Sequence, residues 1–365
     1  MQIDQDTLDW LLGNAGPIIR YRTRVELLKE SDNRKVESLK KDLLSDSLVQ
    51  SWLGCLRPNI RTHVMHGSKS EAFENAMGKL YEFGLRGGMR ILDEKTEPFR
   101  RWLAQQTDHP TILPFFRTLV AAFLSMTGYS EEDAVNTWIL KRLETLYLFA
   151  KKNDFEDIYI PQDTFPSFPK AFRRKPLLNP TLQTEDGSML PSIHDINAFL
   201  HSEPVMEDPQ LRSKVETIVD FILGPEYQKL YPGYGVVMLS GRYYSAGWSV
   251  HLPGYFKSDV RNDHPYQFPI GPDQSTHPSP LLRLSLMSRS RTAREHAWFK
   301  RSLSLLASFG TENGLVSFPR SFLPEKKVGY WVNGNRMALE AGRRGRKAIT
   351  CESTFRYLEI AVKST

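Results

Sequence analysis

The sequence is poor in cysteine, and it has neither a long apolar run nor a basic start. Cys55 and Cys351 are its two cysteines, too few for a disulfide framework and not spaced as zinc ligands. The longest notable apolar run, residues 119–124, is far shorter than the roughly 18 residues that span a bilayer. The first nine residues contain three aspartates and no lysine or arginine, unlike the basic opening of a secretory signal. We therefore predict a cytoplasmic protein without a membrane span, a bound metal or a cofactor.

The composition is otherwise ordinary for a globular protein, with 40% hydrophobic and 25% charged residues. The charge is unevenly distributed, because residues 251–365 contain 18 basic and 9 acidic residues, and residues 1–250 contain 30 and 33. This basic surplus suits an anionic ligand such as a diphosphate or an acidic sugar, and it is also typical of a solvated surface. We favour the solvated surface and expect no nucleic acid partner, because no aromatic residues that stack bases alternate with the arginines.

The first 150 residues predict helices in antiparallel pairs. Apolar residues recur three and four positions apart, and glycine, proline, asparagine and serine mark the turns. Serine caps are expected at Ser70 and Ser130, each followed by acidic residues. The helices expected in this part cover residues 6–12, 17–28, 36–44, 48–53, 70–83, 99–106, 112–126 and 131–151.

The amino-acid composition changes in the later part of the chain, before further helices are expected. Residues 154–191 contain six prolines and no periodic apolar face, which predicts a long ordered connector that covers a cavity mouth. Residues 227–268 are rich in aromatic residues and are interrupted by glycines. Further helices are expected at residues 192–201, 209–223, 291–309 and 353–362. Together these patterns predict an all-α fold.

Five segments carry a resemblance to a known superfamily. They are WLLGNAGPIIRYRTRVELL at residues 10–28, residues 52–85, LPSIHDINAF at 190–199, YWVNGNRMALEAG at 330–342 and CESTFRYLEI at 351–360. The chain resembles bacterial proteins with the α/α toroid of terpene cyclases and protein prenyltransferases. The resemblance implies one toroid domain, residues 1–365, with two concentric rings of paired helices around a cavity. It also implies an enzyme that acts on a small terpenoid-like or other organic substrate.

The motifs that carry catalysis in this superfamily are incomplete here. Terpene cyclases of the toroid fold use a DxDD motif, and the nearest run in this chain is Asp154, Glu156 and Asp157. A carboxylate cluster that follows two lysines is more typical of a solvated helix end. Prenyltransferases hold a catalytic zinc, for which the HxxH pair His63 and His66 lacks an identifiable third ligand.

The segment LPSIHDINAF contains the strongest pair of catalytic candidates. Pro191 and Ser192 should begin a helix, which places His194 and Asp195 in its first turn. The helix dipole stabilises a carboxylate there. His194 is the adjacent acid or base, because imidazole titrates near neutral pH. The structural alternative is that Asp195 caps backbone amides and pairs with an arginine.

A second group of candidates lies further along the sequence. Tyr330, Trp331, Arg336, Glu340 and Glu352 combine aromatic faces with both signs of charge, a composition typical of a ligand-binding wall. We predict that Glu352 is catalytic and that the other four bind substrate. The alternative is ordinary packing, with Glu352 at the N-cap of the last helix.

Three further residues complete the predicted site. His66 is expected to be catalytic, and Tyr234 and Trp248, from the aromatic stretch, are expected to bind substrate. In a toroid, the residues that follow each connector meet at a common mouth. The predicted members of one shared cavity are His66, His194, Asp195, Trp331, Glu340 and Glu352.

Two other functions remain open from the sequence. Toroids of paired helices also include carbohydrate lyases and hydrolases, which use tyrosine, histidine and paired carboxylates. The incomplete motifs equally favour a non-catalytic binding or scaffold protein that keeps the toroid. The sequence indicates no particular oligomeric state.

Overall fold

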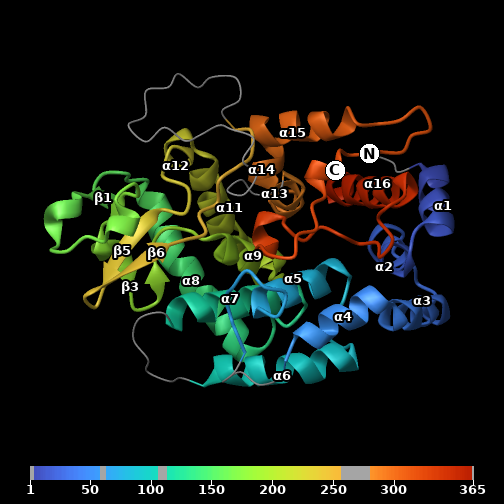
Figure 1. The fold of residues 1–365 in the computed structure, drawn as a ribbon, viewed down its shortest axis with the longest axis horizontal. Coiled ribbons are helices and arrows are strands. Elements are labelled where there is room, and N and C mark those ends of the chain that lie inside the picture. Colours follow the sequence, from blue (N-terminus) through green and yellow to red (C-terminus); the bar gives the residue numbers. More distant parts are fainter. Residues whose placement is uncertain (1–3, 58–62, 106–112, 256–279, 364–365) are drawn as a thin grey trace. The chain divides into compact units, whose positions relative to one another are not determined.

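The computed structural model describes residues 4–57, 63–105, 113–255 and 280–363 (Figure 1). Helices account for 59% of the structure and strands for 7%, so the prediction of a largely helical fold is confirmed. The chain forms two compact units. The terminal unit contains Met1–Phe99 and Ser275–Thr365, and the central unit contains Arg100–Gln274. The arrangement of the helices as a toroid stays a prediction.

Helices make up most of the terminal unit. Pro17 occupies the first position of its second helix, where its missing N–H costs no hydrogen bond. The side chains of Asp32 and Asp46 cap the next two helices. The helix α6 (Arg90–Ala104) begins in this unit and ends in the central unit. The other described helices of this unit are α1 (Gln5–Asn14), α2 (Pro17–Arg22), η1 (Thr23–Leu27), α3 (Asn33–Ser45), α4 (Ser47–Cys55), α5 (Phe73–Glu82), α13 (Pro280–Met287), α14 (Arg291–Glu295), α15 (Ala297–Ala307), η5 (Arg320–Phe322), η6 (Trp331–Asn333) and α16 (Arg346–Lys363).

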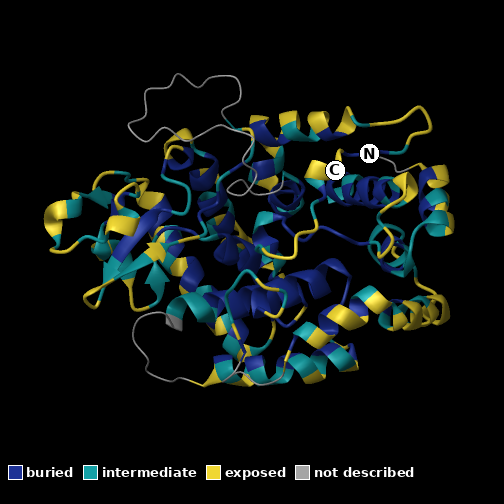
Figure 2. Cartoon of the chain, viewed as in Figure 1, coloured by how far each residue is buried: buried dark blue, intermediate teal, exposed yellow. Residues whose placement is uncertain are grey.

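The helix α5 is buried along its whole length. Every residue from Phe73 to Glu82 is buried, including the polar side chains of Glu74, Asn75 and Lys79. Figure 2 shows this helix and much of α16 in the dark blue of buried residues. A helix that is buried on all sides needs neighbours all round, and α4 and η6 both pack on α5. We therefore treat α5 as the core helix of the terminal unit.

Both serine caps expected from the sequence are wrong. The helix α5 begins at Phe73 rather than at Ser70. The N–H of Phe73 donates to the carbonyl of Val64 at 2.8 Å. A backbone carbonyl, rather than a serine side chain, therefore accepts this N–H at the start of the helix. The N-cap of α8 is Glu132 rather than Ser130, and it makes no side-chain capping bond.

Two helices near the end of the chain also differ from expectation. The last helix begins at Arg346 rather than at residue 353, so Glu352 lies inside α16 and is not at its N-cap. The helix expected at 291–309 is divided into α14 and α15. His296 separates them, because its backbone is extended and its imidazole accepts the N–H of Trp298 as a new N-cap.

The central unit places its helices around the pair α7 and α9. These two helices pack against each other, and α8 packs on α11. Across the described ranges, no helix has both the length and the apolar composition needed to cross a membrane. The α-helices of this unit are α7 (Leu113–Met126), α8 (Asp133–Lys152), α9 (Ile193–His201), α10 (Glu203–Glu207), α11 (Pro209–Leu223) and α12 (Pro225–Gln228).

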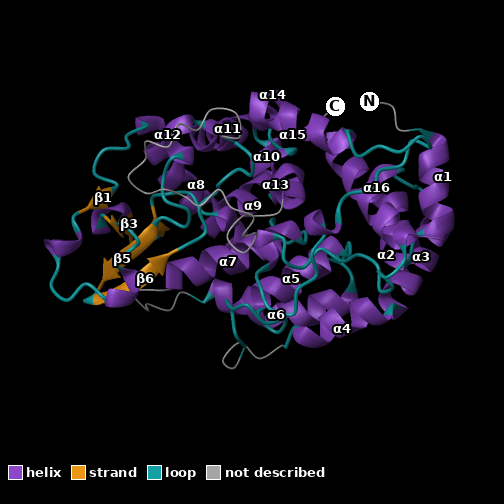
Figure 3. Ribbon diagram, turned by 45° about the horizontal axis from the view of Figure 1, so that its top comes forward, coloured by secondary structure: helices purple, strands orange, loops and turns teal. Residues whose placement is uncertain are grey.

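A small sheet in the central unit corrects the expectation of an all-α fold. Figure 3 shows its strands in orange. The strand order is β1-β2-β5-β6, in which β2 and β5 are parallel and the other pairs are antiparallel. A separate hairpin joins β3 to β4. The strands are β1 (Tyr159–Ile160), β2 (Leu177–Leu178), β3 (Gln183–Thr184), β4 (Gly187–Ser188), β5 (Gly235–Leu239) and β6 (Arg242–Ala246).

The predicted connector, residues 154–191, therefore contains four of these strands. Each of the four is two residues long, too short to show an alternating pattern in the sequence. The strand β5 passes close to Pro176, the residue before β2, at Gly235, which has φ +94°. A Cβ atom there would lie 2.3 Å from the carbonyl oxygen of Pro176, so this approach requires glycine.

Candidate functional site

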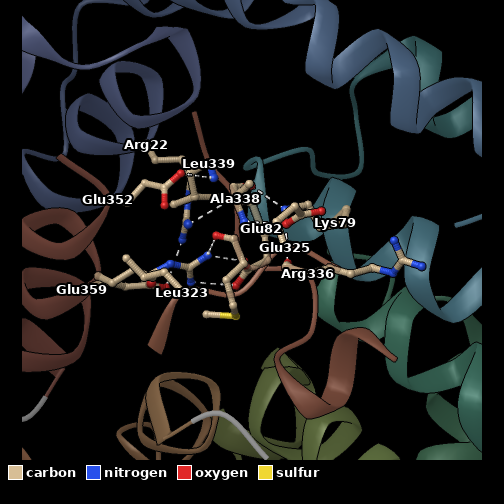
Figure 4. Close-up of polar contacts among 12 residues, drawn as sticks. Arg22, Lys79, Glu82, Leu323, Glu325, Arg336, Ala338, Leu339, Glu352 and Glu359 are labelled. Atoms are coloured by element: carbon tan, nitrogen blue, oxygen red, sulfur yellow. Dashed lines mark hydrogen bonds and ion pairs between the residues drawn. The ribbon is translucent and has the colours of Figure 1, made fainter. Parts of the chain in front are cut away.

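The terminal unit buries many charged side chains. Charged residues are rarely buried unless they are paired, so their partners show how this unit is built. Many of these residues come from α5 and α16, and Figure 4 shows several of them together. Among the residues of this unit that the structure describes, the buried charged ones are Arg22, Glu74, Lys79, Glu82, Arg283, Arg336, Glu352, Arg356 and Glu359.

His66 and Glu74 form an imidazole–carboxyl pair at the start of α5. His66 Nδ1 lies 2.7 Å from Glu74 Oε1, and the same oxygen accepts the N–H of Gly67 at 2.8 Å. The side chain of Glu74 is fully buried, whereas that of His66 is 25% exposed. Burial raises the pKa of Glu74, although His66 and the Gly67 amide act in the opposite direction. The pair thus joins a buried carboxyl group to an imidazole that solvent reaches.

The other histidine of the HxxH pair has a different environment. His63 is buried edge-on against Phe73 and Phe99, with ring centroids 6.4 and 5.4 Å away. Burial lowers the pKa of His63, and the charge of Arg57 lowers it further. Within the described part of the chain, no three His, Cys, Asp or Glu side chains gather as a metal site. His63 therefore belongs to the core, and His66 alone joins the candidate site.

Two of the predicted aromatic residues lie beside this pair. The ring of Tyr330 stacks on that of His66, with 5.0 Å between centroids and an angle of 19° between planes. The ring of Trp331 lies on α5 at Gly78, where a Cβ atom would be 2.3 Å from the indole. Asn75 Oδ1 accepts the N–H of Trp331 at 2.7 Å. Tyr330 therefore contacts the imidazole directly, whereas Trp331 packs against the core helix.

Arg336 holds together two loops near His66. Its guanidinium donates to the carbonyl of Ser68 and the hydroxyl of Ser70 in one loop, at 2.9 and 3.1 Å. In the other loop, it donates to the carbonyls of Lys326, Lys327 and Gly329 at 3.1–3.2 Å. These contacts occupy the guanidinium with acceptors of the protein itself. Arg336 thus acts as a clamp between the loops.

Lys79 is fully buried in the middle of α5 (Figure 4). Its Nζ donates to the carbonyl of Arg336 at 3.2 Å and to that of Ala338, and it lies 3.7 Å from Glu325 Oε2. Burial lowers the pKa of Lys79, and the charge of Glu325 opposes this effect. Three acceptors match the three N–H groups of an ammonium. Lys79 therefore ties the segment that contains Arg336 to the core helix.

A chain of ion pairs joins α5 to α2 and α16 (Figure 4). Arg356 donates to both carboxylate oxygens of Glu82, at 3.1 and 2.5 Å. Arg22 donates to the backbone carbonyl of Glu82 at 2.9 Å and to the carboxylates of Glu26 and Glu359 at 2.7 and 3.0 Å. Each buried charge in this series of ion pairs has a partner of opposite charge, which compensates for its loss of hydration.

Glu352 and Glu340 are held by backbone amides. Glu352 Oε1 accepts the N–H groups of Leu339 and Glu340 at 2.8 and 2.9 Å. Its Oε2 accepts two N–H groups of Arg343 at 2.9 and 2.7 Å. Four donors fill the acceptor sites of a carboxylate. Glu352 therefore fastens the segment of Leu339, Glu340 and Arg343 to α16. Glu340 accepts the N–H of Gly16 at 2.7 Å, which places a carboxylate at the N-terminus of α2.

Asp195 has the structural role that the sequence left as its alternative. It forms a capping box with Ser192 at the start of α9. Its two oxygens also accept N–H groups of Arg142 at 2.9 and 3.2 Å. Arg142 donates in addition to the carbonyls of Asp186 and Ser188, at 3.0 and 2.7 Å. Asp195 is 1% exposed, and it joins α9 to α8 and to the β3–β4 hairpin.

The other predicted residues of the central unit are close to α9. His194 is fully buried among the rings of Phe115, Phe123 and Trp248, with centroids 5.8–6.1 Å away. Tyr234 donates to the carbonyl of Pro191 at 2.7 Å, and burial raises its pKa well above the ordinary value. His194 and Tyr234 are therefore enclosed by protein, and Trp248 is partly exposed.

The D-x-E-D run forms a solvated helix end. Lys152 lies 2.7 Å from Asp154, which also accepts the N–H of Glu156 at 2.9 Å. The hydrogen bond from Lys152 lowers the pKa of the Asp154 carboxyl. A carboxyl group with a lowered pKa is ionised near neutral pH and holds no proton to give, which agrees with the structural interpretation favoured by the sequence.

The predicted site residues fall into two groups, one in each unit. That His66, His194 and Asp195 line one cavity stays a prediction. The members in the terminal unit are His66, Tyr330, Trp331, Arg336, Glu340 and Glu352. The members in the central unit are His194, Asp195, Tyr234 and Trp248.

The sequence analysis missed the buried partners on α5. Glu74, Lys79 and Glu82 lie in one short helix, FENAMGKLYE. Lys79 and Glu82 are three positions apart and share one face of this helix, as charges on a solvated helix do. Their spacing therefore gave no signal that the helix is buried.

Comparison of the chain with protein-family models, with curated proteins and with solved structures finds no match. The resemblance to the toroid superfamily therefore rests on the five sequence segments alone.

Proposed function

We propose that the terminal unit carries an acid–base catalytic site in which His66 transfers a proton and Glu74 positions it. The observation that carries this proposal is the 2.7 Å contact between a part-exposed imidazole and a fully buried carboxyl group. Enzymes commonly use such a pair to orient a histidine and to stabilise its charged form. The reaction class is proton transfer to or from a small organic molecule.

Under this proposal, each atom of the pair has a separate task. His66 Nδ1 faces Glu74, so Nε2, on the opposite side of the ring, is the atom that exchanges a proton with substrate. When Nε2 gains a proton, the imidazolium lies against the carboxylate of Glu74. The stacked ring of Tyr330 adds the attraction of a π-face to this cation. Gly67, whose N–H binds Glu74, keeps the carboxyl group in place.

The surroundings of the pair support an apolar substrate. Val64 and Val328 are 56% and 60% exposed, and they lie in the loops that meet through the bond from Gly329 N–H to Ser68 O at 2.8 Å. Exposed apolar side chains beside a polar group are typical of sites for small organic ligands. The terpenoid class expected from the resemblance fits this description, and it stays a prediction.

The proposal is tested by proton exchange in heavy water. The full-length protein is incubated with prenyl alcohols, prenyl diphosphates and terpenoid aldehydes and ketones, and mass spectrometry measures conversion and deuterium bound to carbon. We expect at least one compound to react, and His66→Asn to slow that reaction about 100-fold or more. Glu74→Gln should slow it less, because the imidazole itself remains.

His201→Asn provides the matched control. This part-exposed histidine ends α9, where its Nδ1 lies 2.9 Å from the carbonyl of Asn197. The control should react at the wild-type rate. An equal rate in wild type and His66→Asn would refute the proposal.

A second candidate function is a non-catalytic scaffold. The observation that favours it is the complete pairing of Glu82 and Glu352, whose carboxylates are each bound by an arginine. Under this alternative, no compound reacts, and His66→Asn changes stability without changing any turnover.

A further inference from the structure

A serine and a histidine of the central unit have the geometry of a nucleophile and its base. Ser249 Oγ lies 2.7 Å from His251 Nδ1. His251 Nε2 lies 2.8 Å from the carbonyl oxygen of Leu230. The N–H of Gly233 donates to Ser249 Oγ at 2.7 Å. Ser249 and His251 belong to the central unit, whereas His66 and Glu74 belong to the terminal unit.

The hydrogen bonds determine which atoms carry protons. A carbonyl oxygen accepts but cannot donate, so the contact with Leu230 requires a proton on His251 Nε2. In a neutral imidazole, Nδ1 then has the free electron pair, and the hydroxyl of Ser249 donates to it. The amide of Gly233 occupies one acceptor position on Ser249 Oγ. The serine proton therefore points at its base, while a carbonyl group orients that base.

The backbone around the pair is held on both sides of Ser249. The carbonyl of Trp248 accepts the N–H of Ile193 at 2.7 Å. The N–H of Val250 donates to the hydroxyl of Tyr227 at 2.9 Å. Hydrogen bonds on both neighbours hold the serine in one position, which is what a reactive group requires.

Two residues beside the pair adopt a costly backbone conformation. Trp248 precedes Ser249 and has φ +77°, and Tyr234 follows Gly233 and has φ +57°. Left-handed backbone is unfavourable for bulky residues, and it persists only where the surroundings impose it. Hydrogen bonds hold the carbonyl of Trp248 and the hydroxyl of Tyr234. Trp248 adjoins Ser249 itself, and Tyr234 adjoins Gly233, whose N–H binds Ser249 Oγ.

Solvent reaches the pair on the side of His251 and Trp248, which are half-buried. Ser249 itself is buried, with 8% of its surface exposed. The partly exposed indole provides an apolar surface next to the serine. An ester with a small acyl group matches this environment, because it needs one apolar contact and one attacking oxygen.

We propose that Ser249 is a nucleophile that accepts an acyl group from a small activated ester, with His251 as its general base. Ser249 Oγ bonds to the ester carbonyl carbon, and its proton passes to His251 Nδ1. The bond from that carbon to the leaving oxygen then breaks, and the leaving alcohol takes the proton from Nδ1. Water hydrolyses the resulting acyl-serine by the same proton route, which releases the acid.

The test uses the full-length protein and a fluorophosphonate probe. Ser249 Oγ attacks phosphorus, fluoride leaves, and the hydroxyl proton passes through His251 to solvent. We expect peptide mapping by mass spectrometry to locate one phosphonyl group on Ser249. Labelling should be faster at pH 8 than at pH 5, because a protonated imidazole cannot act as a base. Hydrolysis of p-nitrophenyl acetate should follow the same pH dependence.

Variants separate this role from a structural one. Ser249→Ala should abolish labelling, and His251→Gln should slow it about 100-fold or more. Ser245→Ala, in an exposed serine of β6, is the matched control and should label as the wild type does. The mapping of the wild-type protein decides the question even if Ser249→Ala fails to fold. A wild type without label on Ser249, or a His251→Gln variant that labels at the wild-type rate, would overturn the proposal.

Discussion

The two units of this protein bury charge to very different extents. Among the described residues, nine buried Asp, Glu, Lys and Arg side chains belong to the terminal unit and two to the central unit. The two in the central unit are Arg142 and Asp195, which pair with each other. Its helices α7 and α9 pack together, and both bury apolar side chains such as Phe123 and Phe199.

The difference follows the way each unit is assembled along the chain. The terminal unit joins segments from both ends of the sequence, and its bonds Arg22–Glu359 and Arg356–Glu82 link residues 337 and 274 positions apart. The central unit is one continuous segment, and the partners in its buried pair are 53 positions apart. Apolar contacts tolerate many alternative registers, whereas a buried charge requires one partner. We infer that the buried charges select the correct pairing of the distant segments.

The largest expected effect comes from breaking a buried pair in the terminal unit. Glu82→Leu leaves the guanidinium of Arg356 buried without its carboxylate, and we expect it to lower the free energy of unfolding by about 3–5 kcal/mol. Hydrogen exchange, read at the amides of α5 and of α9, measures the loss and shows whether the terminal unit bears it.

A double variant and an exposed pair sharpen this test. Glu82→Leu combined with Arg356→Met should recover most of the stability, because no unpaired charge remains. Glu94→Leu should change little, since Glu94 and its partner Arg90 are 62% and 91% exposed. If Glu82→Leu behaved like Glu94→Leu, the buried pairs would not be what holds the terminal unit together.

A smaller loss is expected from the single buried pair of the central unit. Asp195→Asn keeps an oxygen for the capping box but removes the charge opposite Arg142. We expect a loss of about 2–3 kcal/mol, measured by the same exchange experiment at the amides of α9. A loss below about 0.5 kcal/mol, the usual limit for a surface change, would favour the catalytic interpretation of Asp195.

Two glycines in neighbouring helices of the terminal unit provide the next test. Gly78→Ala places a Cβ atom 2.3 Å from the ring of Trp331, and overpacking of this kind costs about 1–3 kcal/mol. Gly54→Ala in α4 meets nothing within 4 Å, so it should stabilise the protein by up to about 1 kcal/mol. Urea unfolding of the two variants should therefore shift in opposite directions. A shift in the same direction would show that the tryptophan moves aside.

The smallest effect is a dependence of the terminal unit on acid pH. Burial alone would raise the pKa of Glu359, but Lys363 and Arg22 outweigh it and hold that pKa well below the ordinary 4.5. A lowered carboxyl pKa stabilises the fold above pH 4.5, and this stability is lost as the pH falls through the folded pKa. The loss should be at most ~1.4 kcal/mol per pH unit for this group.

Unfolding by urea between pH 6 and pH 3 measures this dependence. Glu359→Gln should be less stable at pH 6 and should show a flatter pH profile than the wild type. A variant profile as steep as that of the wild type would mean that other carboxyl groups account for the acid sensitivity.

The site shows where prediction from the sequence succeeds and where it stops. Ser192 and Asp195 were correctly placed at a helix start, because their spacing of three is a local capping signal. The strands of the connector were missed, since two-residue strands such as Leu177–Leu178 leave no periodic pattern. Glu352 was identified as a notable residue, yet its position inside α16 and its bond to Arg343 were not foreseen.

The sequence by itself determined the helical character of the chain, because the spacing of apolar residues and many of the helix ends depend on neighbours within a few positions. The tertiary structure decided the state of each charged group. Whether Glu74 is a solvated helix residue or the buried partner of His66 depends on burial and on a loop that folds back onto α5. Burial and long-range partners set the energy of a charge, and neither is encoded in local spacing.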